Sequence, residues 1–211
     1  MGLIRVEQEV NAVNFVNYLN NSIQVFLDQL PFFLKFVAIF WVVHLANRFV
    51  FKGRLLLLGI LPRHPLGLLG IFCSPFLHGD WPHLIANSLM LMVLGMFVLV
   101  SGLTVFYVVT CMIIVLSGLL TWSFAREGLH VGASGLVMGY WGYLLVQGYY
   151  RPSVAAVAIV AVCLYYFIGM FANLFPEDKT VSWEGHVFGF IAGVITVFSQ
   201  TGVMSVFHLN P

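Results

Sequence analysis

The amino-acid sequence predicts an all-α, polytopic membrane protein. Its 211 residues are 61% hydrophobic and only 8% charged, whereas roughly 25% of the residues of a soluble domain are charged. The apolar residues gather in uncharged runs of about 17–25 residues, which is the length that crosses hydrocarbon as an α-helix. Because backbone polar groups in lipid must be satisfied internally and no alternating barrel pattern is present, every span is expected to be helical.

Six runs are long enough to cross a bilayer. The first carries Lys35 near its start, where a long side chain can reach the membrane interface. Ser101-Gly102 separates the second run from the third, and Arg151-Pro152 separates the fourth from the fifth, as turns would. The six expected spans lie near residues 31–51, 83–101, 103–122, 132–149, 153–172 and 184–201.

Two segments do not fit a simple span. Residues 1–30 place valines at near-helical spacing with Asn and Gln between them, which indicates an amphipathic surface segment; a loosely ordered leader is the alternative. Residues 52–82 form an apolar connection that is cut by prolines, so we expect it to lie in the interface or to re-enter the bilayer partly. The sequence thus divides into the surface segment, a six-helix domain at 31–205 and a tail at 206–211.

Charge and cysteine usage exclude several classes of function. The formal net charge of +1 leaves no basic patch for a nucleic acid, and the acidic residues within 1–30 argue against a cleaved signal peptide. The cysteines fit neither a disulfide framework nor a CxxC metal site, and no histidine cluster has metal-ligand spacing, so we expect no metal and no cofactor. The scattered cysteines are Cys73, Cys111 and Cys163; the histidines expected at interfaces are His44, His64, His130 and His208.

Four polar residues open three of the expected spans. His83 and Asn87 open the second span, Ser134 opens the fourth and His186 opens the sixth. Because consecutive helices alternate in direction, these three spans begin at the same membrane face, which puts the four side chains at similar depth. A histidine in such a span is costly and is a functional candidate by default.

Glycines offer these side chains a way to meet. Small residues at steps of three or four let helix backbones approach closely in lipid. If the two stripes face each other, Ser134 and His186, each beside a stripe glycine, come within reach; the alternative is that the serine merely lies beside a packing stripe. The first stripe is Gly128, Gly132, Gly135, Gly139 and Gly142, and the second is Gly185, Gly189 and Gly193.

The chemistry of these residue types indicates a Ser–His dyad. A serine hydroxyl is a weak nucleophile until a base takes its proton, and imidazole is the usual base at neutral pH. The backbone N–H groups at a helix start, with the amide of Asn87 and assistance from His83, could stabilise an oxyanion. The alternative for His83 and Asn87, which share a helix face, is a hydrogen-bond clamp between helices. A triad fits less well, because Glu184 lies only at the edge of its span.

At this point the motifs match a family: the sequence resembles the rhomboid intramembrane serine proteases over essentially the whole six-span chain. The resemblance rests on three motifs in order, each at a helix start. They are His78-Gly79-Asp80-Trp81-Pro82-His83-Leu84 followed by Asn87, then Gly132-Ala133-Ser134-Gly135, then Gly185-His186 with Gly189 and Gly193.

The resemblance implies roles for these positions. Ser134 would be the nucleophile and His186 the general base, with His83, Asn87 and the Ser134 N–H forming the oxyanion hole. His78 would hold the loop structurally. The connection at 52–82 would be the family's membrane-embedded first loop, and residues 173–183 the cap through which substrate and water enter. The remaining structural positions, where small residues allow close packing, would be Gly132, Gly135, Gly189 and Gly193.

Two positions depart from the family pattern. Many bacterial members carry an aromatic residue four positions after the serine, stacked on the catalytic histidine, and Met138 occupies that position here. With methionine at this position, His186 is expected to be held less tightly, or by a thioether contact. The Trp-Arg pair of some members' first loop is replaced by Leu69-Gly70, which puts the details of loop anchoring in doubt.

Orientation is predicted differently by charge and by resemblance. The resemblance implies a cytoplasmic N-terminus in a bacterial inner membrane and a site that opens to the exterior. That orientation leaves more positive residues outside than inside, so the positive-inside rule favours the inverse. We prefer the orientation of the family, because an embedded loop blurs the count. The outer residues would be Arg48, Lys52, Arg54, Arg63, Arg126 and Lys179.

The expected function is an intramembrane serine endopeptidase that cleaves transmembrane segments near the membrane face. Its expected partners are transmembrane protein substrates and the lipid bilayer, and the oligomeric state is not predicted. The alternative is a catalytically silent relative that binds client helices, but silent relatives generally lack the serine or the histidine, and Ser134 and His186 are both present. A transporter would need charged groups or broken helices at mid-membrane depth.

Overall fold

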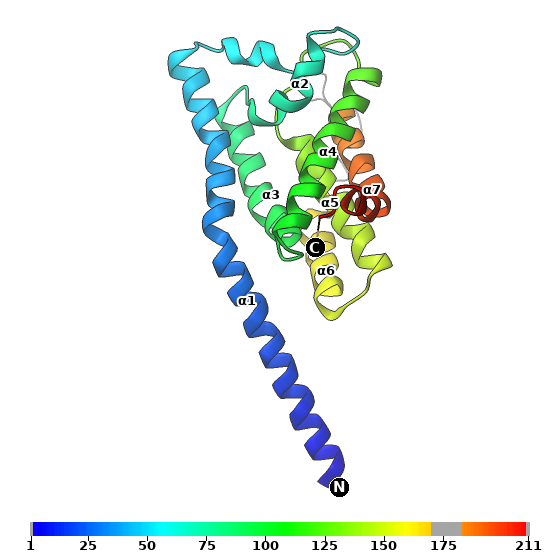
Figure 1. The fold of residues 1–211 in the computed structure, drawn as a ribbon. Helices are drawn as coiled ribbons and strands as arrows, with labels where there is room; N and C mark the ends of the chain where they lie inside the picture. The colour runs from blue at the N-terminus through cyan, green and yellow to red at the C-terminus, as the bar shows by residue number, and fades with distance from the viewer. Residues whose placement is uncertain (1, 170–182, 210–211) are drawn as a thin grey trace.

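The computed structural model describes residues 2–169 and 183–209, and this part of the chain is helical apart from turns and one isolated backbone bridge. The expected all-α, polytopic fold is confirmed (Figure 1). The α-helices are α1 (Gly2–Leu45), α2 (Gly67–Cys73), α3 (Trp81–Leu99), α4 (Leu103–Phe124), α5 (Ser134–Tyr150), α6 (Val154–Phe167) and α7 (Trp183–Val206). A π-helical turn, Ala46–Val50, and two 3-10 turns, Arg54–Leu58 and Ser74–Phe76, complete the elements.

Four helical segments of the described chain are long and apolar enough to cross a membrane. The helix α5, with 17 residues, is at the lower end of the spanning length, and the 14 residues of α6 are shorter. The expected fifth span extended to residue 172, and its last residues lie outside the described part of the chain. The cap expected at 173–183 also lies outside the described part, except for Trp183. The four long segments are Leu27–Val50, Trp81–Leu99, Leu103–Phe124 and Trp183–Val206.

The helix α1 is continuous across the boundary that the sequence suggested at residue 30. It has 44 residues and contains Pro31 without ending there. Its N-terminal part extends away from the other helices along the same axis (Figure 1). The segment 1–30 is therefore joined to the first span without a turn between them.

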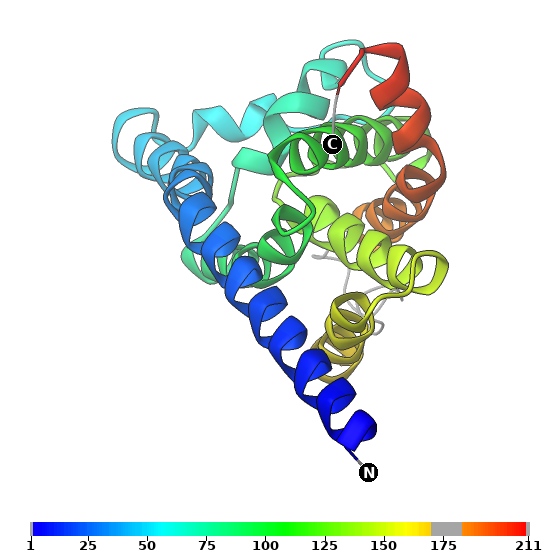
Figure 2. The same ribbon diagram turned by 60° about the horizontal axis from the view of Figure 1, so that its bottom comes forward.

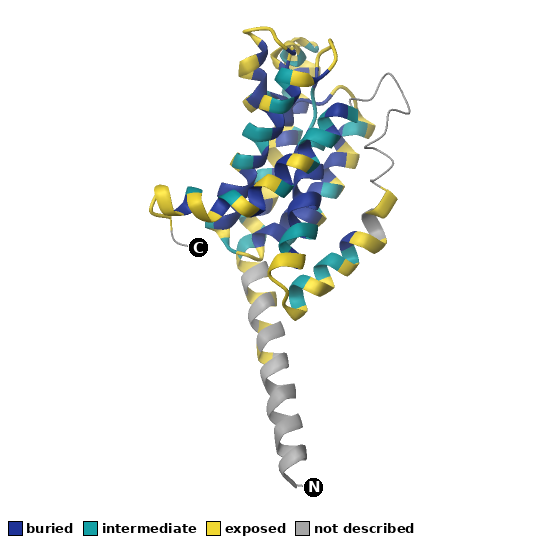
Figure 3. Cartoon of the chain, turned by 90° about the vertical axis from the view of Figure 1, so that its right-hand side faces the viewer, coloured by how far each residue is buried: buried dark blue, intermediate teal, exposed yellow. Residues whose placement is uncertain are grey.

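The helix α5 lies at the centre of the molecule. All its residues from Leu136 to Leu144 are buried (Figure 3), and α7, α4, α3 and α6 pack around it. The helix α1 lies at the edge of the bundle, against α3 (Figure 2). A helix buried on all sides in a membrane protein is well placed to carry a site that excludes lipid and bulk water.

The helices α3, α5 and α7 begin at the same end of the bundle, as helix alternation predicts (Figure 1). The start of α3 is fixed locally, because the side chain of Asp80 caps the helix by accepting from the His83 N–H at 2.8 Å. Pro82 in the first turn removes a backbone donor that would be unpaired there. The polar residues that open these helices therefore share one end of the molecule.

The connection before α3, residues 46–80 between α1 and α3, lies at this same end (Figure 1). It consists of short helical segments, of which α2 packs against α4. Large apolar side chains remain exposed along it, as expected for a segment that faces lipid. They include Leu57, Leu66, Leu69 and Phe72.

Candidate active site

The loop that leads into Ser134 is held by the connection before α3. Ile60 and His130 exchange backbone hydrogen bonds, each N–H donating to the other's carbonyl at 2.9 Å. Two residues beyond His130, the Gly132 N–H donates to the Ser74 carbonyl at 2.9 Å. Ser134 follows as the first residue of α5. Its backbone position is therefore set by contacts from outside its own helix.

His78 makes a third contact to this loop. The Ala133 N–H donates to His78 Nε2 at 3.4 Å, and His78 is only 1% exposed. Burial, with the nearby His83 as a second cause, lowers the pKa of His78 to about 4. The ring is therefore neutral at physiological pH, which it must be to accept a hydrogen bond, because a protonated imidazole is a donor only.

Gly132 brings His83 and Asn87 against the serine loop. Its φ is +116°, in a region that favours glycine. A Cβ built at this position would lie 2.5 Å from Cε1 and 2.6 Å from Nε2 of His83, and 3.6 Å from Nδ2 of Asn87. The imidazole and the amide therefore approach the backbone only two residues before Ser134.

The amide of Asn87 is a buried donor. Asn87 is 6% exposed, and its Nδ2 atom has no hydrogen-bond partner among the described residues. A buried amide N–H without a partner is costly. It is also the kind of group that stabilises negative charge as the charge develops.

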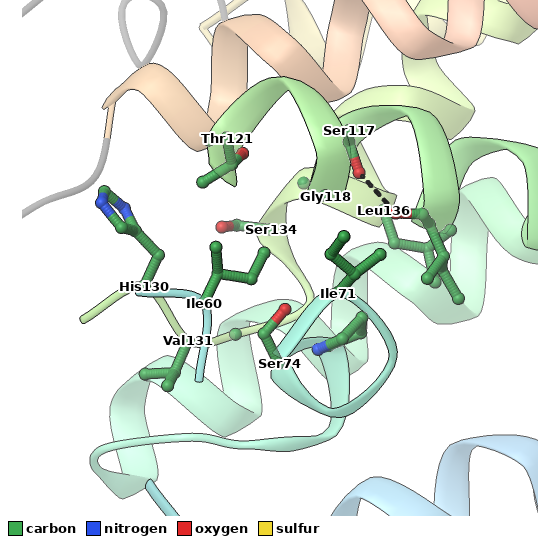
Figure 4. A pocket seen from close by; sticks show the side chains of 15 residues that line it. Ile60, Ile71, Ser74, Ser117, Gly118, Thr121, His130, Val131, Ser134 and Leu136 are labelled. Atoms are coloured by element: carbon green, nitrogen blue, oxygen red, sulfur yellow. Dashed lines mark hydrogen bonds between the residues drawn. The ribbon is translucent and has the colours of Figure 1, made fainter. Parts of the chain in front are cut away.

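Ser134 lines a small cavity of about 50 Å³ at the start of α5. In Figure 4 its hydroxyl faces the same space as Thr121, Ile60 and His130. Ser134 is half-buried. The cavity is lined by both polar and apolar groups, and a space of this size has room for water.

The glycines of α5 and α7 face each other, as the sequence predicted. A Cβ at Gly189 would overlap the carbonyl of Gly135, and a Cβ at Gly193 would overlap the carbonyl of Gly139. A Cβ at Gly135 would lie 3.4 Å from the Gly185 carbonyl oxygen. The two backbones are therefore in close contact at Gly135, which immediately follows Ser134, and Gly189, which lies three positions after His186.

The first glycine stripe is shorter than predicted. Gly128 and Gly132 lie before the start of α5, both with positive φ, in the loop and not on the helix face. The stripe expected to begin at Gly128 therefore begins at Gly135. The reason is that this glycine spacing continues into a turn that needs left-handed backbone, which periodicity alone does not reveal.

His186 is buried in the first turn of α7. Two residues before it, Glu184 forms an ion pair with Arg126, and the distance from Arg126 Nε to Glu184 Oε1 is 3.3 Å. Only 8% of the Glu184 side chain is exposed. The pair joins the start of α7 to the loop that follows α4. Sequence reasoning did not find it, although an acidic residue in a first helical turn was a signal.

The first loop is anchored without the Trp-Arg pair. The Arg63 N–H donates to the Trp122 carbonyl at 2.9 Å, and Arg63 Nη1 donates to the Ala125 carbonyl at 2.7 Å. The indole Nε1 of Trp122 donates in turn to the His64 carbonyl at 2.9 Å. An arginine and a tryptophan thus still join this loop to the bundle, from different positions.

Two histidines that were expected at interfaces are buried instead. His44 is 3% exposed and His130 is 8% exposed. The ring of His130 bonds to the Arg126 carbonyl at 3.1 Å, and that of His44 bonds to the His78 carbonyl at 3.1 Å. Their places near helix ends suggested the interface, but the connection before α3 folds over that end of the bundle.

Two further expectations concern Met138 and metal binding. Met138 is 2% exposed and belongs to the apolar core. Across residues 2–169 and 183–209, no group of three or more His, Cys, Asp or Glu side chains is arranged to hold a metal ion.

Comparison with known proteins identifies the family. The model of the Rhomboid domain matches residues 66–201. An uncharacterized protein of Mycobacterium tuberculosis is 36% identical over 174 residues, which cover 78% of this chain and 72% of that protein. An uncharacterized protein of Mycobacterium leprae is 34% identical over 140 residues, covering 62% of this chain and 55% of that protein. The matched region and the apolar helices show that the chain is an integral membrane protein that belongs to the rhomboid family.

Proposed function

We propose that the protein is an intramembrane serine endopeptidase. The observation that carries the proposal is the approach of His83 and of the unpaired Asn87 amide to Gly132, two residues before Ser134. A donor pair on a helix, beside the backbone two residues before a serine at a helix start, is suited to an oxyanion. The close packing of Gly135 on α5 against Gly189 on α7, three positions after His186, supports the pairing of Ser134 with a base on α7.

In the proposed reaction the Ser134 Oγ attacks the carbonyl carbon of a peptide bond while His186 takes the hydroxyl proton. The resulting oxyanion accepts hydrogen bonds from Asn87, His83 and the Ser134 N–H. Collapse of this intermediate breaks the C–N bond, and His186 returns the proton to the leaving amine. A water molecule, activated by His186 in the same way, then hydrolyses the acyl-enzyme.

The proposed catalytic unit is a dyad. Glu184 is the acidic residue nearest to His186 in the sequence, and its Oε1 is engaged by Arg126. Packing between α5 and α7, where the glycine backbones touch, would hold the two catalytic side chains in register. In this arrangement helix contact performs the positioning that a carboxylate performs in a triad.

The proposed substrates are transmembrane segments of other membrane proteins. The site lies at one end of the bundle, at the shared start of α3, α5 and α7 (Figure 1), so the scissile bond would lie near one membrane face. By similarity to the family, we propose a bacterial inner membrane with the N-terminus in the cytoplasm and the site open to the exterior.

The test is cleavage of a transmembrane model substrate by the purified full-length protein in proteoliposomes. Wild type should cleave, whereas Ser134→Ala and His186→Ala should each lose all measurable cleavage. Ser117→Ala is the matched control, because Ser117 lines the same cavity but has no proposed role. Equal rates for wild type and Ser134→Ala would exclude the proposed mechanism.

A further inference from the structure

We propose that His44, on α1, is a positioning residue that holds the serine loop in place through His78. The proposal rests on the proposed protease function and extends it to a helix that carries none of the proposed catalytic groups.

His44 holds the main chain of His78. Its Nδ1 atom lies 3.1 Å from the His78 carbonyl oxygen, with both residues buried. A carbonyl oxygen can only accept, so the proton of this hydrogen bond is on Nδ1. His44 lies at the end of α1, next to the π-helical turn that begins at Ala46, so a donor on the first span fixes the residue that precedes α3 by three positions.

The ring of His44 is seated with little freedom. It packs edge-on against the Trp81 ring, with the centroids 4.6 Å apart. Its Nε2 atom is buried and has no hydrogen-bond partner in the described part of the chain. Burying an imidazole with one unpaired nitrogen on a transmembrane helix costs free energy that an apolar side chain would not cost. This cost favours a role for the Nδ1 donor over simple packing.

His78, whose main chain is held by His44, contacts the site in two places. Its Nε2 accepts the Ala133 N–H at 3.4 Å, immediately before Ser134. Its ring also lies edge-on to the ring of His83, with the centroids 5.1 Å apart. One residue, held from α1, therefore orients both the loop of the nucleophile and one of the proposed oxyanion donors.

Loss of this donor should reduce turnover more than substrate binding. A displacement of about 1 Å in a catalytic loop can lower a rate by up to about 100-fold. We expect His44→Leu to lower kcat about 10-fold with KM within about threefold of wild type. His44→Asn keeps a donor at the same number of bonds from Cβ as Nδ1, so it should restore kcat to within about threefold.

The experiment measures kcat and KM of the purified full-length variants on one transmembrane substrate. His44→Gln carries the same amide one methylene further out, so it should lose kcat while His44→Asn retains it. This pair decides the question if His44→Leu does not fold. Equal kcat values for the Asn and Gln variants, or wild-type kcat in His44→Leu, would overturn the proposal.

A double variant tests the route through His78. If His44 acts through His78, His44→Leu combined with His78→Leu, which removes the side-chain acceptor, should have about the kcat of the slower single variant. Multiplied losses would contradict that route. Failure of the proposed function is distinguishable: wild type itself would then neither cleave the substrate nor react with a fluorophosphonate probe, and the role of His44 would fall with it.

Discussion

Asn87 is the residue at which burial and hydrogen bonding conflict most directly. Its amide Nδ2 is buried without a partner among the described residues, and it lies against the loop that precedes Ser134. In folding terms such a donor is a cost. In catalysis it is a preorganised group that gains its partner as negative charge develops on the substrate, which is when the interaction lowers the barrier.

Replacing Asn87 by Ala should therefore lower kcat by about 10- to 1000-fold, since loss of one oxyanion donor costs up to about 1000-fold. Steady-state kinetics on the transmembrane substrate measures the change. Ser88→Ala is the control, because Ser88 is also buried on α3 but accepts from the Trp41 indole and so engages α1. Unchanged kcat in Asn87→Ala would leave Asn87 as a packing residue.

At the residue scale the sequence predicted which side chains to examine but not all of their surroundings. Ser134, His186, His83 and Asn87 could be identified because they are polar groups that open apolar spans. The approach of His83 to Gly132 could not be predicted, since it depends on a left-handed turn.

The ion pair of Arg126 with Glu184 and the hydrogen bond of His44 to the His78 carbonyl join residues 58 and 34 positions apart, the differences of their residue numbers. A contact between a helix and an irregular segment leaves no periodic pattern in a sequence. These two contacts were therefore not predicted.

At the element scale, the contact between α5 and α7 organises the site. Small residues let these helices touch backbone to backbone, so Gly189 meets Gly135 and Gly193 meets Gly139. In lipid, where apolar surface gives little drive for association, such close packing supplies the attraction between helices. Facing glycine stripes could be predicted because both follow helical periodicity, and the first fails only before α5 begins, at Gly128 and Gly132.

Alanine at Gly189 or at Gly193 should force α5 and α7 apart. Each added methyl overlaps a backbone carbonyl of the facing helix, so we expect a loss of about 1–3 kcal/mol in stability and of most activity. Gly202→Ala on the same helix is the control, because its added Cβ meets no atom within 4 Å and alanine favours a helix. Thermal unfolding in detergent and cleavage rates measure both effects; equal behaviour of the Gly189 and Gly202 variants would contradict the packing account.

At the scale of the whole molecule, the connection before α3 joins the peripheral helix α1 to the central helix α5. Ile60, Ser74 and His78 each form hydrogen bonds with a different residue just before Ser134: His130, Gly132 and Ala133, in that order. An apolar run broken by prolines predicted that this segment would not span the membrane. That it holds the serine loop follows only from the three-dimensional structure.

This arrangement makes stability depend on the protonation of His78. Its pKa is lowered to about 4, mainly by burial, while an unfolded histidine titrates near 6.5. Between these values the unfolded chain binds the proton and the folded chain does not, so stability is complete above about pH 6.5 and falls as the pH drops towards 4. The loss attributable to His78 across this window is about 3 kcal/mol.

Thermal unfolding in detergent at a series of pH values measures this dependence. His78→Gln keeps a side-chain acceptor that does not titrate, so its stability should decline less steeply between pH 6.5 and 4. Parallel profiles for the two proteins would show that the decline arises from other groups.

The central claim is that Ser134 is an activated nucleophile, and covalent labelling tests it most directly. The purified full-length protein, its Ser134→Ala variant and the Ser117→Ala control are incubated with a fluorophosphonate probe, and the labelled residue is identified by mass spectrometry. We expect labelling of wild type and of the control at Ser134, and none of Ser134→Ala. Equal labelling of Ser134→Ala, or no labelling of wild type under conditions in which it is folded, would show that Ser134 is not an activated nucleophile.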